Sequence, residues 1–329
     1  MSDKCIIVVA GPTASGKTKL GIELAKLYQG EIVSADSMQL YRGMDVGTAK
    51  ATPDEQAEAV HHMIDVIDPA EAYSAARYVE EAGRVCDDIL ARGKTPIVVG
   101  GTGLYIDSLI AGRDFADNQE DRSLRTALEA EFDERGGEAM LKTLAAFDPE
   151  RAAKLNAGDR RRIVRAIEIY RLTGRTATEH DEETHRRPPR YDAARIVLNF
   201  KDRADLYARI DRRVTKMAED GLFDEVERLL AAGLSADCTA MQAIGYKEAV
   251  LALKGEMTRD EALDLIRRGS RRYAKRQITW FNRWEGAHRI LWAREPDFAA
   301  ALSSSTAFLK SRGYHGDYVS THAILMTER

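Results

Sequence analysis

The chain has 329 residues, 44% of them hydrophobic and 31% charged, which is long enough for one sizeable core and a second module. Its formal net charge of −4 argues against a generally nucleic-acid-binding surface, so any RNA partner must be recognised by local basic clusters. Cys5, Cys86 and Cys238 are far apart and form no CxxC pair, which disfavours a disulfide framework or a zinc site. No signal peptide and no long apolar run are evident, so we expect a cytoplasmic protein that does not associate with membranes.

A phosphate-binding loop is the clearest motif. Residues 11–18 match G-x-x-x-x-G-K-[ST] and lie between an apolar run and a helical pattern that starts near Leu20. Backbone N–H groups of such a loop surround one anion, Lys17 adds positive charge, and the Thr18 hydroxyl can complete a Mg²⁺ shell. The predicted diphosphate-binding residues are therefore Gly11, Pro12, Thr13, Ala14, Ser15, Gly16, Lys17 and Thr18, with Thr18 as the metal ligand. The loop does not say which bond breaks.

Two other turns follow apolar strand patterns. Asp36 ends the run 31–35, and Thr102 follows the run 95–99 within the glycine-rich turn 100–105. Ligands of open α/β sheets bind beyond the carboxyl ends of the strands, so Asp36 is expected near the phosphate site. A catalytic or metal-associated role is one interpretation of Asp36, and a plain turn residue is the other. Thr102 is the one side chain in its turn that could hydrogen-bond a ligand, although the turn could equally be structural.

The chain changes character after Gly112. Residues 113–158 are helix-forming and strongly charged, and no strand pattern returns until 195–200. This arrangement predicts an α/β fold: a P-loop NTPase-like parallel sheet flanked by helices, with an inserted all-helical domain. We place the catalytic core at 1–112 and 186–295, the inserted domain at 113–185, and a C-terminal tail of uncertain structure at 296–329.

Basic residues cluster in three places: 160–165, 186–190 and the helix that follows the capping box at 258–261. On that helix one face carries residues at 4-4-3-4 spacing: Arg268, Arg272, Arg276, Thr279 and Arg283. Another face carries Ile266, Tyr273, Gln277, Trp280 and Trp284. Cations interleaved with rings suit single-stranded nucleic acid, whereas an aromatic core face backed by a solvated basic face is the alternative. We favour a core role for the aromatic side chains and a phosphate-rich partner for the arginines.

Taken together, the motifs resemble those of the tRNA dimethylallyltransferases, also called isopentenyl-tRNA transferases. The matching stretches are GPTASGKT (11–18), SADSMQLYRGMDVGTAK (34–50), GGTGLY (100–105), RRRIVRAIEIY (160–170), MQAIGYKE (241–248) and RRYAKRQITWF (271–281). The region 112–158 matches only in general character.

The resemblance implies transfer of a dimethylallyl group from dimethylallyl diphosphate to the exocyclic amine of the adenosine 3′ of the anticodon in tRNA. It implies Asp36 as general base, Lys17 and Thr18 as ligands of the diphosphate and Mg²⁺, and Thr102 near the target base. The inserted domain would grip the anticodon stem-loop. We further expect nucleotide binding, ATP included, and a monomer.

The resemblance also implies a set of tRNA-binding residues from four segments and the glycine-rich turn. They are Asp36, Ser37, Met38, Gln39, Thr102, Arg160, Arg161, Arg162, Ile163, Val164, Gln242, Ala243, Ile244, Gly245, Tyr246, Lys247, Lys275, Arg276, Gln277, Ile278, Thr279, Trp280, Phe281 and Asn282. In the loop 241–248 we expect Gln242, Tyr246 and Lys247 to be exposed.

Two other functions fit a phosphate-binding loop. A P-loop nucleotide or small-molecule kinase would use ATP and would have no need of the arginine stripe. A non-catalytic RNA-binding module would have no need of Asp36.

Overall fold

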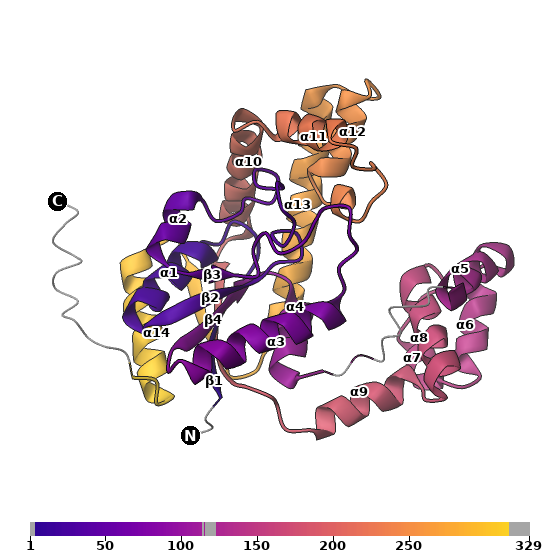
Figure 1. Cartoon of the computed structure of the whole chain (residues 1–329), viewed down its shortest axis with the longest axis horizontal. Coiled ribbons are helices and arrows are strands. Elements are labelled where there is room, and N and C mark those ends of the chain that lie inside the picture. Colours follow the sequence, from indigo (N-terminus) through magenta and orange to yellow (C-terminus); the bar gives the residue numbers. More distant parts are fainter. Residues whose placement is uncertain (1–3, 114, 116–122, 316–329) are drawn as a thin grey trace. The chain divides into compact units, whose positions relative to one another are not determined.

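The computed structural model describes residues 4–113, 115 and 123–315. The chain divides into two compact units, each with its own core (Figure 1). The first unit is made of the chain up to Ile110 together with the chain from Arg190 onward, and the second is Ala111–Pro189. The second unit therefore begins slightly before and ends slightly after the limits that we predict for the insertion, 113 and 185.

The first unit is built on a parallel sheet. Among the described residues it has six strands: β1 (Cys5–Ala10), β2 (Gly30–Ala35), β3 (His61–His62), β4 (Thr95–Gly100), β5 (Asp192–Phe200) and β6 (His288–Trp292). Their order is β3-β2-β4-β1-β5-β6, and every pairing is parallel. β1 lies between β4, which precedes the insertion, and β5, which follows it. The predicted parallel sheet is confirmed, and its central strands are continuous apolar runs because helices cover both faces.

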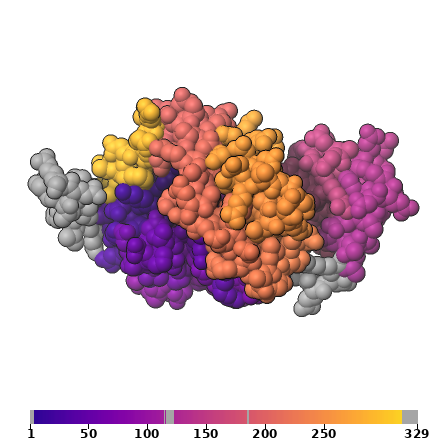
Figure 2. All heavy atoms as spheres, turned by 90° about the horizontal axis from the view of Figure 1, so that it is seen from above, coloured from indigo at the N-terminus to yellow at the C-terminus, as the bar shows by residue number. Residues whose placement is uncertain are grey.

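Helices cover this sheet and extend beyond it. They are α1 (Lys17–Leu27), α2 (Pro53–Glu58), α3 (Ala75–Ala91), α4 (Gly103–Ala111), α10 (Arg203–Glu219), α11 (Leu222–Ala231), α12 (Tyr246–Leu253), α13 (Arg259–Phe281) and α14 (Phe298–Ser311), with the 3₁₀ turn η1 at Ala240–Gln242. The capping box predicted at the start of α13 is present. Helices α10 to α13 lie side by side, coloured salmon to orange in Figure 2. None of the helices in the described part of the chain is long and apolar enough to span a membrane.

The second unit is helical throughout its described residues. Its helices are α5 (Ser123–Arg135), α6 (Gly137–Ala145), α7 (Pro149–Ala153), α8 (Arg160–Thr173) and α9 (Ala177–Arg186). Leu128, Met140 and Ile163 lie in its apolar core and are fully buried. Glu168 is buried at the edge of this core, where Arg125 donates two hydrogen bonds to it, at 3.0 and 2.9 Å. The second unit therefore has a hydrophobic core that is separate from the core of the first unit.

The C-terminal part of the first unit differs from our expectation. Strand β6 was not predicted, and α14 lies in the segment that we left without structure. Leu309 of α14 is fully buried, and the Tyr314 hydroxyl donates to Ile6 O of β1 at 2.9 Å. The pattern was missed because α14 is rich in small residues and β6 is short, so neither has a strong hydrophobic period. Residues 316–329 lie outside the described part of the chain.

Glu225 of α11 joins two distant segments of the first unit. Its side chain is buried, and its carboxylate accepts hydrogen bonds from the backbone N–H groups of Asp45 (2.8 Å), Val46 (2.8 Å) and Gly47 (3.1 Å). The Tyr246 hydroxyl donates to the same carboxylate at 2.6 Å. Tyr246 is therefore 0% exposed, and the prediction that it is exposed for RNA contact is wrong. The Tyr246 hydroxyl supplies the fourth hydrogen bond to the buried Glu225 carboxylate, which would otherwise have fewer donors around it.

Replacing Glu225 by Gln should destabilise the fold. The Gln amide would place an NH₂ donor opposite groups that are themselves donors and need an acceptor. We therefore expect a loss of about 2–3 kcal/mol in the free energy of unfolding, measured by urea denaturation. Tyr246→Phe is the matched control, because it removes one of the four hydrogen bonds and should cost about 1 kcal/mol. A loss for Glu225→Gln no larger than for Tyr246→Phe would contradict the role given to this carboxylate.

Candidate active site

Three turns meet at one edge of the sheet. β2, β4 and β1 are neighbours, and their last residues Ala35, Gly100 and Ala10 are in register. The phosphate loop follows β1, Asp36 follows β2 and Thr102 follows β4, so all three leave the sheet at its carboxyl end. The structure thus brings the predicted catalytic residues together, while their chemical roles stay predictions.

The phosphate loop is held by residues from the far end of the chain. Gly16 has φ +86°, a conformation that favours glycine, and a Cβ at this position would lie 2.8 Å from the Phe298 ring. The Trp292 indole N–H donates to Ser15 O at 2.9 Å. Neither aromatic residue was singled out in the sequence, because neither lies in a recognised motif. The loop conformation therefore depends on β6 and α14 as well as on its own glycines.

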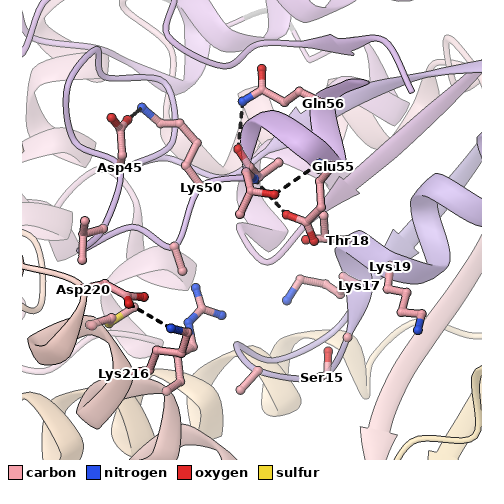
Figure 3. A pocket seen from close by; sticks show the side chains of 18 of the residues that line it. Ser15, Lys17, Thr18, Lys19, Asp45, Lys50, Glu55, Gln56, Lys216 and Asp220 are labelled. Atoms are coloured by element: carbon pink, nitrogen blue, oxygen red, sulfur yellow. Dashed lines mark hydrogen bonds and ion pairs between the residues drawn. The ribbon is translucent and has the colours of Figure 1, made fainter. Parts of the chain in front are cut away.

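A cavity of about 920 Å³ opens beside the loop (Figure 3). Residues 14–18 of the predicted diphosphate-binding set line it, whereas Gly11, Pro12 and Thr13 do not. The other walls come from residues 45–56, from α10 and from Phe298. The cavity is lined by more basic than acidic side chains: Lys17, Lys19, Lys50, Arg209, Arg212, Arg213 and Lys216 against Asp45, Glu55, Asp65 and Asp220. Such a surface suits a polyanion.

Several of these charges already neutralise one another. Lys50 Nζ lies 2.6 Å from an Asp45 oxygen, and Lys216 Nζ lies 2.8 Å from an Asp220 oxygen, as the dashed lines in Figure 3 show. Lys17 differs, since among the described residues no carboxylate lies within ion-pair distance of it. Its Nζ donates to Pro12 O at 2.8 Å instead. Desolvation and the nearby Arg213 lower the pKa of Lys17 to about 7, while Asp36 partly opposes the shift.

Arg213 of α10 is the functional candidate that sequence reasoning missed. It lines the cavity, and desolvation lowers its pKa while the Asp36 carboxylate opposes that shift. One of its terminal N–H groups donates to Thr48 O at 3.2 Å, and within the described residues no acceptor meets its buried Nε. The only signal in the sequence was its position on α10 beside, and not within, the apolar stripe formed by Leu206, Ile210, Val214 and Met217. Its remaining donors and its charge suit a phosphate group.

Asp36 and Thr102 are not among the residues that line this cavity, although the Asp36 charge acts on Lys17 and Arg213, which do line it. Asp36 Oδ1 accepts a hydrogen bond from Met38 N at 2.9 Å, and Thr102 Oγ1 accepts one from Ser37 N at 3.1 Å. Burial and the Asp36 charge raise the pKa of Tyr273 to about 12, while a hydrogen bond with Thr102 acts in the opposite direction. Tyr273 of α13 is thus part of the same group of side chains, and its phenol stays neutral over the physiological range.

The two faces predicted for α13 are present. The side chains of Arg268, Arg272, Arg276, Thr279 and Arg283 are all exposed. The indole N–H groups of Trp280 and Trp284 both donate to Asp107 of α4, at 2.7 and 2.8 Å, so these rings pack internally, as we favoured.

Some of the predicted tRNA-binding side chains are not accessible. Ile163 and Val164 lie in the core of the second unit, and Gln277 and Phe281 are buried in the first, so these assignments are wrong for the side chains. The reason is geometrical: a continuous stretch of helix covers every face, and only some faces meet solvent. Arg161, Arg162, Gln242, Lys247, Lys275, Thr279 and Asn282 are exposed, as is Arg276.

The chain is similar to enzymes that are described as isopentenyl or dimethylallyl transferases. The family models described as IPP transferase and isopentenyl transferase match residues 39–284 and 4–65. A tRNA dimethylallyltransferase of Acetivibrio thermocellus is 44% identical over 321 residues, covering 98% of this chain and 99% of the relative. One from Carboxydothermus hydrogenoformans is 49% identical over 292 residues, covering 89% and 92%. The chain belongs to the tRNA dimethylallyltransferase family.

Solved structures agree with this membership. A tRNA isopentenylpyrophosphate transferase of Bacillus halodurans has a TM-score of 0.69 and 38% identity, covering 94% of this chain and 98% of its own. A eukaryotic dimethylallyltransferase acting on tRNA has a TM-score of 0.80 and 27% identity, covering 95% and 81%. The predicted fold class, a P-loop NTPase-like sheet flanked by helices, is confirmed, and the family's members are prenyltransferase enzymes.

The lowered pKa of Lys17 predicts proton uptake when an anion binds. At pH 8 the free lysine is mostly neutral, and a bound diphosphate favours its charged form. Calorimetric titration with inorganic diphosphate, in buffers of different ionisation enthalpy, should therefore show uptake of about one proton more than in Lys17→Arg, because arginine stays charged at this pH. Equal proton uptake by the two proteins would show that Lys17 is already protonated without ligand.

Proposed function

We propose that the protein transfers a dimethylallyl group from dimethylallyl diphosphate to the exocyclic amine of the adenosine 3′ of the anticodon in tRNA. The observation that carries this proposal is the convergence of the phosphate loop, Asp36 and Thr102 at one edge of the sheet in a member of this family. The loop accounts for the diphosphate, and a carboxylate outside the phosphate cavity accounts for the amine.

On the diphosphate side the protein must stabilise a leaving anion. The bond between the allylic carbon and the diphosphate oxygen breaks, and the negative charge stays on the diphosphate. Lys17 and Arg213 are placed to balance that charge, together with the N–H groups of the loop. Both side chains already lie beside the loop in the free protein, so little rearrangement is needed when the charge develops.

The acceptor side must provide a base. An adenine amine is a poor nucleophile, and it loses a proton as the new C–N bond forms, so a carboxylate within hydrogen-bond reach assists the attack. Asp36 is a carboxylate at this edge of the sheet, and Thr102, whose hydroxyl accepts a hydrogen bond from Ser37 N, is the neighbouring side chain that would orient the adenine. Water would capture the allylic centre, so the bound RNA must close the site before the C–O bond breaks.

Mg²⁺ fits the loop as a hard cation with oxygen ligands. The Thr18 hydroxyl lines the cavity, and the buried Ser15 Oγ meets no hydrogen-bond partner among the described residues. Mg²⁺ typically binds few protein groups and takes most of its ligands from phosphate and water, so one hydroxyl at the loop is enough. When bound, the ion would neutralise part of the charge on the leaving diphosphate.

For tRNA, the exposed face of α13 provides the clearest surface in the first unit. Its arginines can follow the phosphates of a single-stranded loop, whose bases are splayed out at low cost. In the second unit Arg161 and Arg162 are exposed on α8, which suits a domain that grips the anticodon stem-loop. ATP binding, a monomeric state and a cytoplasmic location stay predictions from the sequence.

The direct test is to incubate the protein with dimethylallyl diphosphate, Mg²⁺ and unmodified tRNA. Digestion of the tRNA followed by mass spectrometry should show N6-dimethylallyladenosine, and Lys17→Ala should abolish most of it. Rapid ATP hydrolysis without tRNA, and no prenylated nucleoside, would favour the kinase instead.

Asp36→Asn should separate binding from chemistry. The amide keeps the size of the side chain and its bond from Met38 N but removes the base, so the single-turnover rate should fall by about 10²–10⁴-fold. Affinity for tRNA should change little. Asp45→Asn is a matched control, because it changes the same charge on the cavity side. A near-normal rate for Asp36→Asn would show that Asp36 only positions the substrate.

Replacing Arg272 and Arg276 together by Gln should weaken tRNA binding and flatten its salt dependence. Each lost phosphate contact reduces the slope of log affinity against log salt by about 0.7–0.9, so the slope should fall by roughly 1.5. A double variant of Arg84 and Lys310, which lie on α3 and α14, makes the same change in net charge away from this face. Equal effects of the two double variants would mean that α13 is not the RNA surface.

A further inference from the structure

Gln277 of α13 bridges the two sides of the site. Its side chain is 4% exposed. Its Oε1 accepts a hydrogen bond from Thr13 N in the phosphate loop at 2.9 Å, and its Nε2 donates to Gly101 O in the glycine-rich turn at 3.0 Å. One buried amide is therefore bonded to the backbone of the loop that holds the diphosphate and to the residue next to Thr102. This placement excludes the predicted role of its side chain in RNA contact.

The orientation of the amide follows from its partners. Thr13 N can only donate and Gly101 O can only accept, so the oxygen must face the loop and the nitrogen the turn. The fit is close, because a Cβ at Gly101 would collide with the Gln277 amide nitrogen. A shorter, a purely donating or a purely accepting side chain could not make both bonds.

The same helix packs closely on the glycine-rich turn beyond Gln277. A Cβ at Gly103 would collide with the Trp280 ring, and the indole N–H groups of Trp280 and Trp284 donate to Asp107 in the helix that follows the turn. Gln277 is thus part of a rigid contact between α13 and the turn, and it is the member of that contact that also reaches the phosphate loop.

We propose that Gln277 is a positioning residue that fixes the separation between the phosphate loop and the turn carrying Thr102, so that the allylic carbon and the adenine amine meet at reacting distance. This inference rests on the proposed function. It also gives α13 two tasks, since its exposed arginines face RNA and its buried glutamine bonds to the loop that holds the diphosphate. Each substrate can still bind to its own loop without Gln277, but the two would no longer be aligned.

Loss of this bridge should lower the rate more than the affinities. Misplacement of reacting groups by about 1 Å can cost on the order of 10²-fold in rate. We therefore expect Gln277 variants to have a strongly reduced single-turnover rate, with dissociation constants for tRNA and for inorganic diphosphate within about threefold of wild type.

The pH dependence of the Gln277→Glu variant distinguishes a positioning role for Gln277 from a merely structural one. An ionised carboxylate can accept from Thr13 N but repels Gly101 O, whereas a protonated carboxyl can accept from one and donate to the other, as the amide does. Burial beside a carbonyl oxygen raises the pKa of the introduced carboxyl. The ratio of variant to wild-type rate should be about 10⁻² at pH 8 and should rise several-fold as the pH is lowered towards 6.

Other groups near this position also titrate or carry charge. They are Tyr273 and Arg276 on α13, Asp36 after β2, Lys17 on α1 and Asp107 on α4. Wild type contains all of them, so the ratio of the two rates at each pH isolates the introduced carboxyl.

Gln277→Met is the matched control, because it has a similar length and volume but makes neither hydrogen bond. Its rate relative to wild type should be low at every pH, with no recovery below pH 8. Urea denaturation verifies that both variants are folded, and if the Met variant is not, the pH dependence of the Glu variant decides alone. A pH-independent ratio for Gln277→Glu, or a wild-type rate for folded Gln277→Met, would overturn the proposal.

The outcome is separable from that of the proposed function. If wild type forms no prenylated adenosine, the proposed function fails. If wild type is active and Gln277→Glu shows no recovery at low pH, the function stands and the positioning role fails.

Discussion

The site depends on two desolvated basic groups that are held close together before any ligand arrives. Lys17 and Arg213 lie beside the same loop, and both have lowered pKa values because the protein desolvates them and Asp36 offsets only part of the charge. For Lys17 the folded-state pKa of about 7 lies below the ordinary value of 10.5. Between these values the unfolded chain binds the extra proton, so this group makes the folded state less stable at pH 7 than at higher pH. A bound diphosphate relieves this cost, which couples the stability of the site to its ligand.

The order of the strands explains how distant parts of the chain reach the phosphate loop. β1 carries the phosphate loop and pairs with β5, which follows the inserted helical segment. Several elements after β5 therefore lie against the loop: α10 brings Arg213, α13 brings Gln277, and β6 brings Trp292. The insertion lengthens the chain without separating these elements from the loop, because it leaves and returns on the two sides of β1.

Sequence reasoning was reliable where function and local structure coincide. The phosphate loop, Asp36 and Thr102 each follow an apolar strand, and a parallel sheet brings the ends of such strands to one edge, so their proximity could be predicted. Arg213 and Gln277 could not be assigned in this way, since their partners lie far along the chain. Helical periodicity predicts which face of a helix a residue lies on, but not which other segment packs against that face. Tyr246 shows the same limit, because its burial depends on Glu225 of another helix. Helix α14 was missed because its packing is set by the sheet rather than by a strong pattern of its own.

Asp36 links the phosphate cavity to the group of side chains around Thr102. Its side chain does not line the cavity, but its charge acts on Lys17 and Arg213 there and also raises the pKa of Tyr273, which is hydrogen-bonded to Thr102. A carboxylate next to a cavity rich in cations suits a reaction in which a diphosphate leaves and a neighbouring nucleophile loses a proton. Helix α13 is bonded to both the phosphate loop and the glycine-rich turn through Gln277, so it can fix the distance between them.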